Sequence, residues 1–234
     1  MARLAAMLVA VIALAGAAQA QNAPNCIDGL LTDEPSADRP GVIGHDAKRV
    51  YFYSGLEAGP ECPAAGEKCR LKSFVVPGDK TLVAPQTVPG FACVGFINSK
   101  GRATVGWIAA DAVTTVTAKE PTLADWLGEW TYYNSTIKIR RDKTPGRIAL
   151  EGYSFVKRLN GMANTGEFSA TVDLPKGHAF GFADRAGDTV PIERAEQYDC
   201  AVKLALVHNI LVVSESGNCG GVGVNFTGFY RRQR

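Results

Sequence analysis

The sequence predicts an all-β protein, in which a small barrel is followed by an eight-stranded antiparallel β-barrel or sandwich. Short runs of β-branched and aromatic residues recur through both halves, and Gly or Pro separates most of them. This punctuation is typical of small barrels and sandwiches. The chain also has six cysteines in 234 residues. An even number of cysteines predicts disulfide crosslinks if the chain is exported to an oxidising compartment.

Composition and charge exclude several classes of protein. The hydrophobic share is 46% and the charged share is 21%, which is ordinary for a globular chain and disfavours long disorder, collagen and coiled coil. The formal net charge is +2, from 25 basic and 23 acidic residues. A dedicated nucleic-acid binder usually has a strongly basic face. We therefore expect no nucleic-acid partner.

Residues 1–20 have the three parts of a secretory signal peptide. Arg3 gives a short positive start, an apolar run extends from Ala6 to Ala17, and Ala18-Gln19-Ala20 is a small-x-small cleavage site. The apolar run is shorter than the roughly 20 residues needed to span a membrane. We expect cleavage after Ala20, a periplasmic or secreted mature protein, and no transmembrane segment in it.

The first half continues with an irregular arm and then strands. Residues 22–48 are rich in Pro, Asp, Gly and Ser without a sustained period, which predicts an extended arm. Turn residues such as Pro77-Gly78-Asp79 separate the runs that follow. The predicted strands are Arg49–Tyr53, Cys69–Val76, Lys80–Val83, Phe91–Ile97 and Thr104–Ile108.

The stretch from Arg49 to Val113 resembles a bacterial SH3-like domain. The residues that carry the resemblance are the aromatic opening Val50–Tyr53, the central Phe91–Phe96 and the closing Gly101–Val113. In that family, a hairpin with Gly-Trp-Ile or Gly-Trp-Val leads into a short helical turn and a last strand. The resemblance implies an SH3-like domain, with its arm, over residues 22–118. It also implies recognition of peptides or wall fragments.

A short helical turn is predicted to link the two halves. Thr122 is followed three residues later by Asp125, which is a capping signature. We expect the turn to end near Leu127. The second domain is then predicted to extend over residues 119–234.

The second half reads as eight strands joined mostly by short loops, so neighbours should pair antiparallel. A barrel of that size is filled by side chains or holds one small ligand. Gly128–Trp130 and Phe226–Tyr230 loosely resemble the two ends of a lipocalin-like barrel; an avidin-like barrel or a sandwich would give similar runs. The predicted strands are Glu129–Tyr133, Thr136–Arg141, Arg147–Tyr153, Glu167–Val172, His178–Ala183, Ala201–Val207, Ile210–Ser214 and Val222–Tyr230.

One hairpin fixes its own register. A two-residue loop at His208-Asn209 would pair Leu206 with Leu211 and Leu204 with Val213, so apolar side chains face one another. In that register Cys200 faces position 217, which is two residues from Cys219. We therefore predict a Cys200–Cys219 disulfide.

The four remaining cysteines allow three pairings. We favour Cys62–Cys69, which closes a loop with six residues between the two cysteines. Cys26–Cys93 then ties the irregular arm to a central strand, because an arm without its own core needs an anchor to stay ordered.

Catalytic and metal-binding motifs are not evident. The three histidines are scattered, and we expect them to lie in exposed turns rather than to bind a metal. They are His45, His178 and His208. There is no nucleophile motif of the G-x-S-x-G, S-x-x-K or C-x-x-C type. We predict no enzyme activity, no catalytic residue, no metal and no cofactor.

Aromatic residues are the candidate binding residues. Tyr51, Tyr53 and Trp107 would form a peptide- or glycan-binding face on the SH3-like domain, and Trp130 and Tyr132 would line the second barrel.

The predicted function is non-catalytic binding in the bacterial envelope, with peptidoglycan, a peptide or an envelope protein as partner. One alternative is an inhibitor or partner of a secreted or wall-degrading enzyme, which would present the loop from Glu57 to Lys68. The other is a small-ligand carrier that uses the second barrel.

Overall fold

The computed structural model describes residues 25–26, 30, 34–35, 39–44, 46, 48–158 and 161–233. The predicted signal peptide and its cleavage site after Ala20 lie outside the described residues, as does His45. The described chain is mostly β, which confirms the predicted fold class. None of its helices has the length and apolar character needed to cross a membrane.

Seven strands form one sheet, called here the first lobe. Its order is β3-β2-β6-β5-β4-β1-β7, with antiparallel pairing throughout. A short 3-10 turn at Ala110–Ala112 precedes the last strand. The strands are β1 (Arg39–Ile43), β2 (Val50–Tyr53), β3 (Arg70–Val75), β4 (Lys80–Val88), β5 (Phe91–Ile97), β6 (Ala103–Ala109) and β7 (Val113–Thr115).

The expectation of a wholly irregular arm is wrong for residues 39–43. These residues form β1, which pairs with β4 on one side and β7 on the other. Gly41 allows this close packing, because a Cβ there would lie 2.5 Å from a Val83 methyl group. The strand has only five residues and contains both Pro40 and Gly41, so no alternating pattern marks it in the sequence.

Nine strands form the second lobe, an antiparallel barrel that is nearly closed. The end strands of the sheet are β11 and β13, and side chains bridge the gap between them. The Thr189 hydroxyl of β13 accepts from the Thr171 amide of β11 at 2.9 Å, and Asp184 of the neighbouring β12 accepts from the Ser169 amide at 2.7 Å. The strands are β8 (Gly128–Tyr132), β9 (Ser135–Arg141), β10 (Arg147–Lys157), β11 (Ala163–Asp173), β12 (Ala179–Arg185), β13 (Asp188–Pro191), β14 (Cys200–Val207), β15 (Ile210–Glu215) and β16 (Gly228–Arg232).

Two details of the predicted barrel are wrong. A ninth strand, β13, follows β12 through a tight turn at Ala186-Gly187, which the predicted eight strands omit. The predicted strand Val222–Tyr230 begins only at Gly228, because the segment before it makes a loop against β11 instead. In that loop Gly220 bridges Gly166, and a Cβ on Gly166 would lie 2.4 Å from the carbonyl oxygen of Cys219.

Local predictions with a geometric basis are confirmed. Leu206 pairs with Leu211 and Leu204 with Val213, as the two-residue loop requires. The linker helix α2 (Leu123–Trp126) begins with a complete capping box. The Asp125 carboxylate accepts from the amide and the hydroxyl of Thr122, and the Thr122 side chain accepts from the Asp125 amide.

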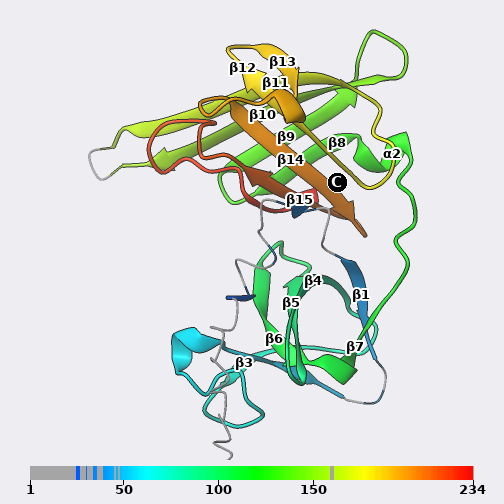
Figure 1. The fold of residues 1–234 in the computed structure, drawn as a ribbon, viewed down its shortest axis with the longest axis vertical. Coiled ribbons are helices and arrows are strands. Elements are labelled where there is room, and N and C mark those ends of the chain that lie inside the picture. The colour runs from blue at the N-terminus through cyan, green and yellow to red at the C-terminus, as the bar shows by residue number, and fades with distance from the viewer. Residues whose placement is uncertain are drawn as a thin grey trace, which may run out of the picture.

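The two lobes share a hydrophobic core, because one cluster of buried residues takes its members from both. In Figure 1, β14 and β15 lie on the side of the second lobe that faces the first lobe. The outer face of β14, β15 and β16 packs on the outer face of β4, β5 and β6, and residues near the N-terminus complete the cluster. We call this cluster the interlobe core; its buried members are Cys26, Leu30, Leu82, Ala84, Cys93, Trp107, Ala205, Val207, Ile210, Val212 and Phe229. Separate clusters fill the first lobe around Phe52 and the barrel around Trp130.

Candidate functional site

The structure contains the three disulfides expected from the sequence, Cys26–Cys93, Cys62–Cys69 and Cys200–Cys219, and no free cysteine is found among the described residues. Three crosslinks fit a protein that folds in an oxidising compartment. The first of them lies in the interlobe core.

The predicted binding face on the first lobe is split by the second lobe. Trp107 is only 1% exposed and belongs to the interlobe core. Tyr53 is half-buried, packs against the same core and meets the Phe91 ring edge-on at 5.4 Å. Trp107 therefore does not belong to an exposed face. The expectation failed because the residue lies on the outside of the first sheet, which the second lobe covers.

Tyr51 occupies the part of that face which remains open. Its ring meets the Phe74 ring edge-on, with centroids 5.8 Å apart. The Arg70 guanidinium lies 4.8 Å from the centre of the Tyr51 ring, and the Arg49 guanidinium lies 4.5 Å from the centre of the Phe74 ring. We call these four residues the arginine–aromatic ladder. Cation–π contacts of this length hold the aromatic rings and the charges together at the surface.

The ladder lies on an edge of the first sheet. β3 has a single neighbouring strand, β2, and the register between them shifts after Tyr51. Arg70, Lys72 and Phe74 occupy every second position of β3 and therefore share one face. Lys72 is exposed, and the Phe74 side chain is 38% exposed. Glu67 pairs with Arg70 at 2.7 Å, so that guanidinium is partly neutralised. The surface is therefore aromatic and, on balance, basic.

The two predicted barrel residues lie in and against the barrel core. Trp130 is 1% exposed and donates its indole N–H to the Trp126 carbonyl at 2.9 Å. Tyr132 packs against the same cluster and is half-buried, and burial raises the pKa of its hydroxyl. Tyr230 is fully buried beside it and donates to the Phe226 carbonyl at 2.7 Å. Packed aromatic side chains thus occupy this part of the barrel interior.

His208 is half-buried between the lobes, which corrects the expectation of an exposed turn. Its Nε2 lies 3.3 Å from the Gly41 carbonyl oxygen of the first lobe. Burial lowers the pKa of the ring, and the nearby Lys80 lowers it further. Within the described part of the chain, no group of three or more His, Cys, Asp or Glu side chains is placed to hold a metal ion.

This burial predicts that acid weakens the fold. The unfolded ring has a pKa of 6.5 and the folded ring a lower one, so the unfolded chain takes up the proton first as the pH falls. Stability is therefore expected to decline below about pH 6.5, until the folded ring is protonated as well.

Urea unfolding at a series of pH values measures the decline, with His208→Asn as the control. Asparagine tolerates the positive φ of 56° at this position but does not titrate. The variant is expected to lose less stability between pH 7 and pH 5 than the natural protein. Equal losses would show that His208 is not the group responsible.

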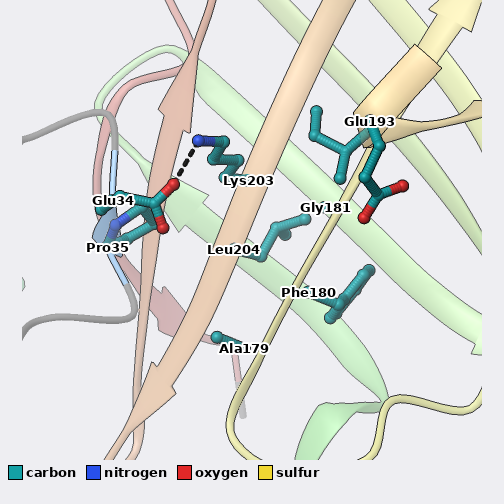
Figure 2. A pocket seen from close by; sticks show the side chains of 9 residues that line it. Glu34, Pro35, Ala179, Phe180, Gly181, Glu193, Lys203 and Leu204 are labelled. Atoms are coloured by element: carbon teal, nitrogen blue, oxygen red, sulfur yellow. Dashed lines mark hydrogen bonds and ion pairs between the residues drawn. The ribbon is translucent and has the colours of Figure 1, made fainter. Parts of the chain in front are cut away.

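A cavity of about 500 Å³ lies beside β12 and β14 (Figure 2). Lys203 forms an ion pair with Glu34 at one side of the cavity, and Glu193 lies across Gly181 on the other. Phe180 and Leu204 are among its apolar lining residues. Glu34 already compensates the lysine charge, so no unpaired cation is found among the described residues that line the cavity.

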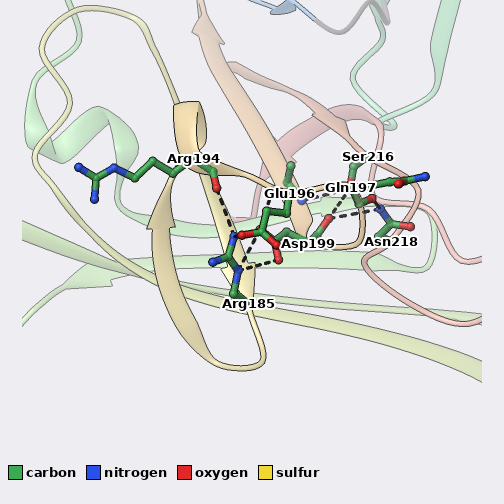
Figure 3. Close-up of polar contacts among 8 residues, drawn as sticks. Arg185, Arg194, Glu196, Gln197, Asp199, Ser216 and Asn218 are labelled. Atoms are coloured by element: carbon green, nitrogen blue, oxygen red, sulfur yellow. Dashed lines mark hydrogen bonds and ion pairs between the residues drawn. The ribbon is translucent and has the colours of Figure 1, made fainter.

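A polar network ties the segment before β14 to the end of the barrel (Figure 3). The Arg185 guanidinium holds the Asp199 carboxylate at 2.8 Å and lies 3.0 Å from Glu196. Hydrogen bonding to Arg185 lowers the pKa of Asp199. Ser216 and Asn218 donate to the backbone carbonyl of Asp199. The donors and acceptors satisfy one another, so we assign this network to structure.

Sequence reasoning named Tyr51 but missed its partners. Arg70, Lys72 and Phe74 alternate within a predicted strand, so they share one face. That alternation was the available signal. The contact with Tyr51 also depends on the pairing of β2 with β3, which places Phe74 opposite Tyr51.

Comparisons of the chain with protein-family models, curated proteins and solved structures found no match.

Proposed function

We propose that the protein is an exported, non-catalytic binding protein of the bacterial envelope, which recognises a wall fragment, a peptide or a partner protein through the arginine–aromatic ladder. The observation that carries this proposal is the surface cluster on an edge of the first sheet, in which Arg49, Arg70 and Phe74 are exposed and Tyr51 is half-buried. Exposed aromatic and arginine side chains are enriched where proteins bind their partners.

Two observations support the location of the protein in the envelope and the class of its ligand. The predicted signal peptide and the three disulfides fit export. The resemblance of Arg49–Val113 to bacterial SH3-like domains favours wall or peptide recognition. This second support is an analogy at the level of the family, and the ladder gives it a specific surface.

The geometry of the ladder suits a ligand with carboxylates and apolar faces. Two aromatic rings offer flat apolar area at a low cost in conformational entropy. Arg49 and Lys72 add positive charge beside them, and peptide stems of bacterial walls contain carboxylates. A ligand of this class would contact both kinds of group at once.

Co-sedimentation with purified peptidoglycan sacculi tests the proposal. The mature protein is expected to sediment with the sacculi, and the double variant Tyr51→Ala/Phe74→Ala is expected to bind at least about tenfold more weakly, since two aromatic contacts are lost. Tyr153→Ala is the matched control, because this tyrosine is 45% exposed on the second lobe.

Equal binding by the double variant and the control would refute the ladder as the binding surface. If the natural protein does not bind sacculi, the wall-fragment reading fails. The same three proteins, immobilised and exposed to envelope extract, then test the partner reading. That reading requires a protein retained by the natural chain and by Tyr153→Ala but not by the double variant.

A further inference from the structure

Two adjoining cavities, of about 320 and 360 Å³, lie where the two lobes meet beside the linker. Both are lined by Asp125, Leu206 and His208. We call the pair the interlobe cleft. Its walls come from the first lobe, from linker residues 116–121 and from the end of β16. Clefts between domains are common places for small-ligand sites.

Positive charge predominates in the interlobe cleft. Lys80 and Lys119 line the cavity of about 360 Å³, and Arg231 and Arg232 line the adjoining cavity of about 320 Å³. The acidic residues there are Glu120 and Asp125, and the Asp125 carboxylate already accepts the amide and the hydroxyl of Thr122. Neither lysine forms an ion pair with an acid in the described part of the chain.

The two arginines are held in place by backbone carbonyls. Arg231 donates through Nη1 to the Asn98 carbonyl at 2.7 Å, which also links the second lobe to the first. Arg232 donates through Nη2 to the Ala124 carbonyl at 2.6 Å and lies 5.3 Å from the centre of the Trp130 ring. A guanidinium has five N–H donors, and these contacts use one nitrogen of each. Their positions are therefore fixed while donors remain for a ligand.

His208 stands at the junction of the two cavities, in the two-residue loop between β14 and β15. Its φ of 56° is the left-handed conformation that two-residue hairpin loops use. Lys80 of the first lobe lines the same cavity as His208.

We propose that the interlobe cleft binds a small anionic group, a carboxylate or a phosphate, in the cavity lined by Lys80 of the first lobe and Lys119 of the linker, with the two arginines of β16 lining the adjoining cavity. Charge-assisted hydrogen bonds from arginine and lysine are the strongest contacts that proteins make to such groups. This site is separate from the ladder and does not depend on the proposed function.

Isothermal titration calorimetry tests the site with two probes, inorganic phosphate and dialanine with a free C-terminal carboxylate. The variant is Lys80→Gln/Lys119→Gln. The control, Lys143→Gln/Lys157→Gln, removes the same charge at exposed lysines that do not line the cleft. We expect the natural protein and the control to bind at least one probe, and the cleft variant to bind it at least about tenfold more weakly.

The probes distinguish the source of the anion. Phosphate binding alone indicates a phosphate ligand. Dialanine binding that disappears when its C-terminus is amidated indicates the end of a peptide. Failure of both probes to bind, or equal weakening in the cleft variant and the control, would overturn the proposal. Circular dichroism of each variant confirms that the fold is retained.

Discussion

A Trp107→Ala variant is expected to lose about 3–5 kcal/mol of stability, and the loss should appear in both lobes. Trp107 is a first-lobe residue that is 1% exposed. It belongs to the same buried cluster as Val207 and Phe229 of the second lobe. Removing the indole leaves a cavity between the lobes, and each lobe loses part of the surface that the other buries.

The chain offers a direct readout of this coupling. Its three tryptophans are Trp107, Trp126 and Trp130. In the variant, tryptophan fluorescence therefore comes only from Trp126 and Trp130, which are buried in the barrel core. Urea unfolding followed by fluorescence is expected to shift to lower urea together with circular dichroism of the whole chain.

Unchanged barrel unfolding in Trp107→Ala would contradict the shared core. Tyr153→Ala, which removes an exposed aromatic from the second lobe, is the control and is expected to change stability little.

Removal of the disulfides is expected to destabilise the protein in the order of the loops they close. Cysteine separations of 67, 19 and 7 residues correspond to about 4, 3 and 2 kcal/mol of restricted unfolded chain, in the loop-entropy description. The pair Cys26→Ala/Cys93→Ala should therefore be the most destabilised, since its sulfurs are also buried in the interlobe core.

Pairwise alanine variants leave no unpaired thiol and make the three measurements comparable. Urea unfolding of the variants gives the order directly. If Cys62→Ala/Cys69→Ala loses the most stability of the three variants, the expected order is contradicted. The loop between these two cysteines would then stabilise β3 more than its length implies.

Structural features that depend on local geometry are the ones that the sequence predicts correctly. The β14–β15 register follows from a two-residue loop, the α2 cap from Thr122 and Asp125, and the Cys200–Cys219 pair from the same register. Each depends on a few adjacent residues or on strict alternation, so no knowledge of distant contacts is needed.

Contacts between distant segments were not predictable in this way. Strand β1 is too short and too rich in Pro and Gly to show a pattern, and its place depends on β4 and β7. The burial of Trp107 depends on the second lobe, because an aromatic on the outer face of a sheet has the same alternation whether solvent or protein covers it. The interlobe cleft likewise needs both lobes and the linker to be placed together.

The proposed function depends on a division of the first sheet's outer face. The part with Trp107 is covered by the second lobe, and the part with Tyr51 and Phe74 is the surface that we propose for binding. Hydroxyl-radical footprinting with mass spectrometry measures both parts in one experiment. We expect Tyr51 and Phe74 to be oxidised in the free protein and protected by saturating sacculi or by a partner protein, while Trp107 is unreactive throughout. Oxidation of Trp107 at the rate of Tyr51 in the folded protein, or unchanged Tyr51 reactivity in the bound state, would contradict the account.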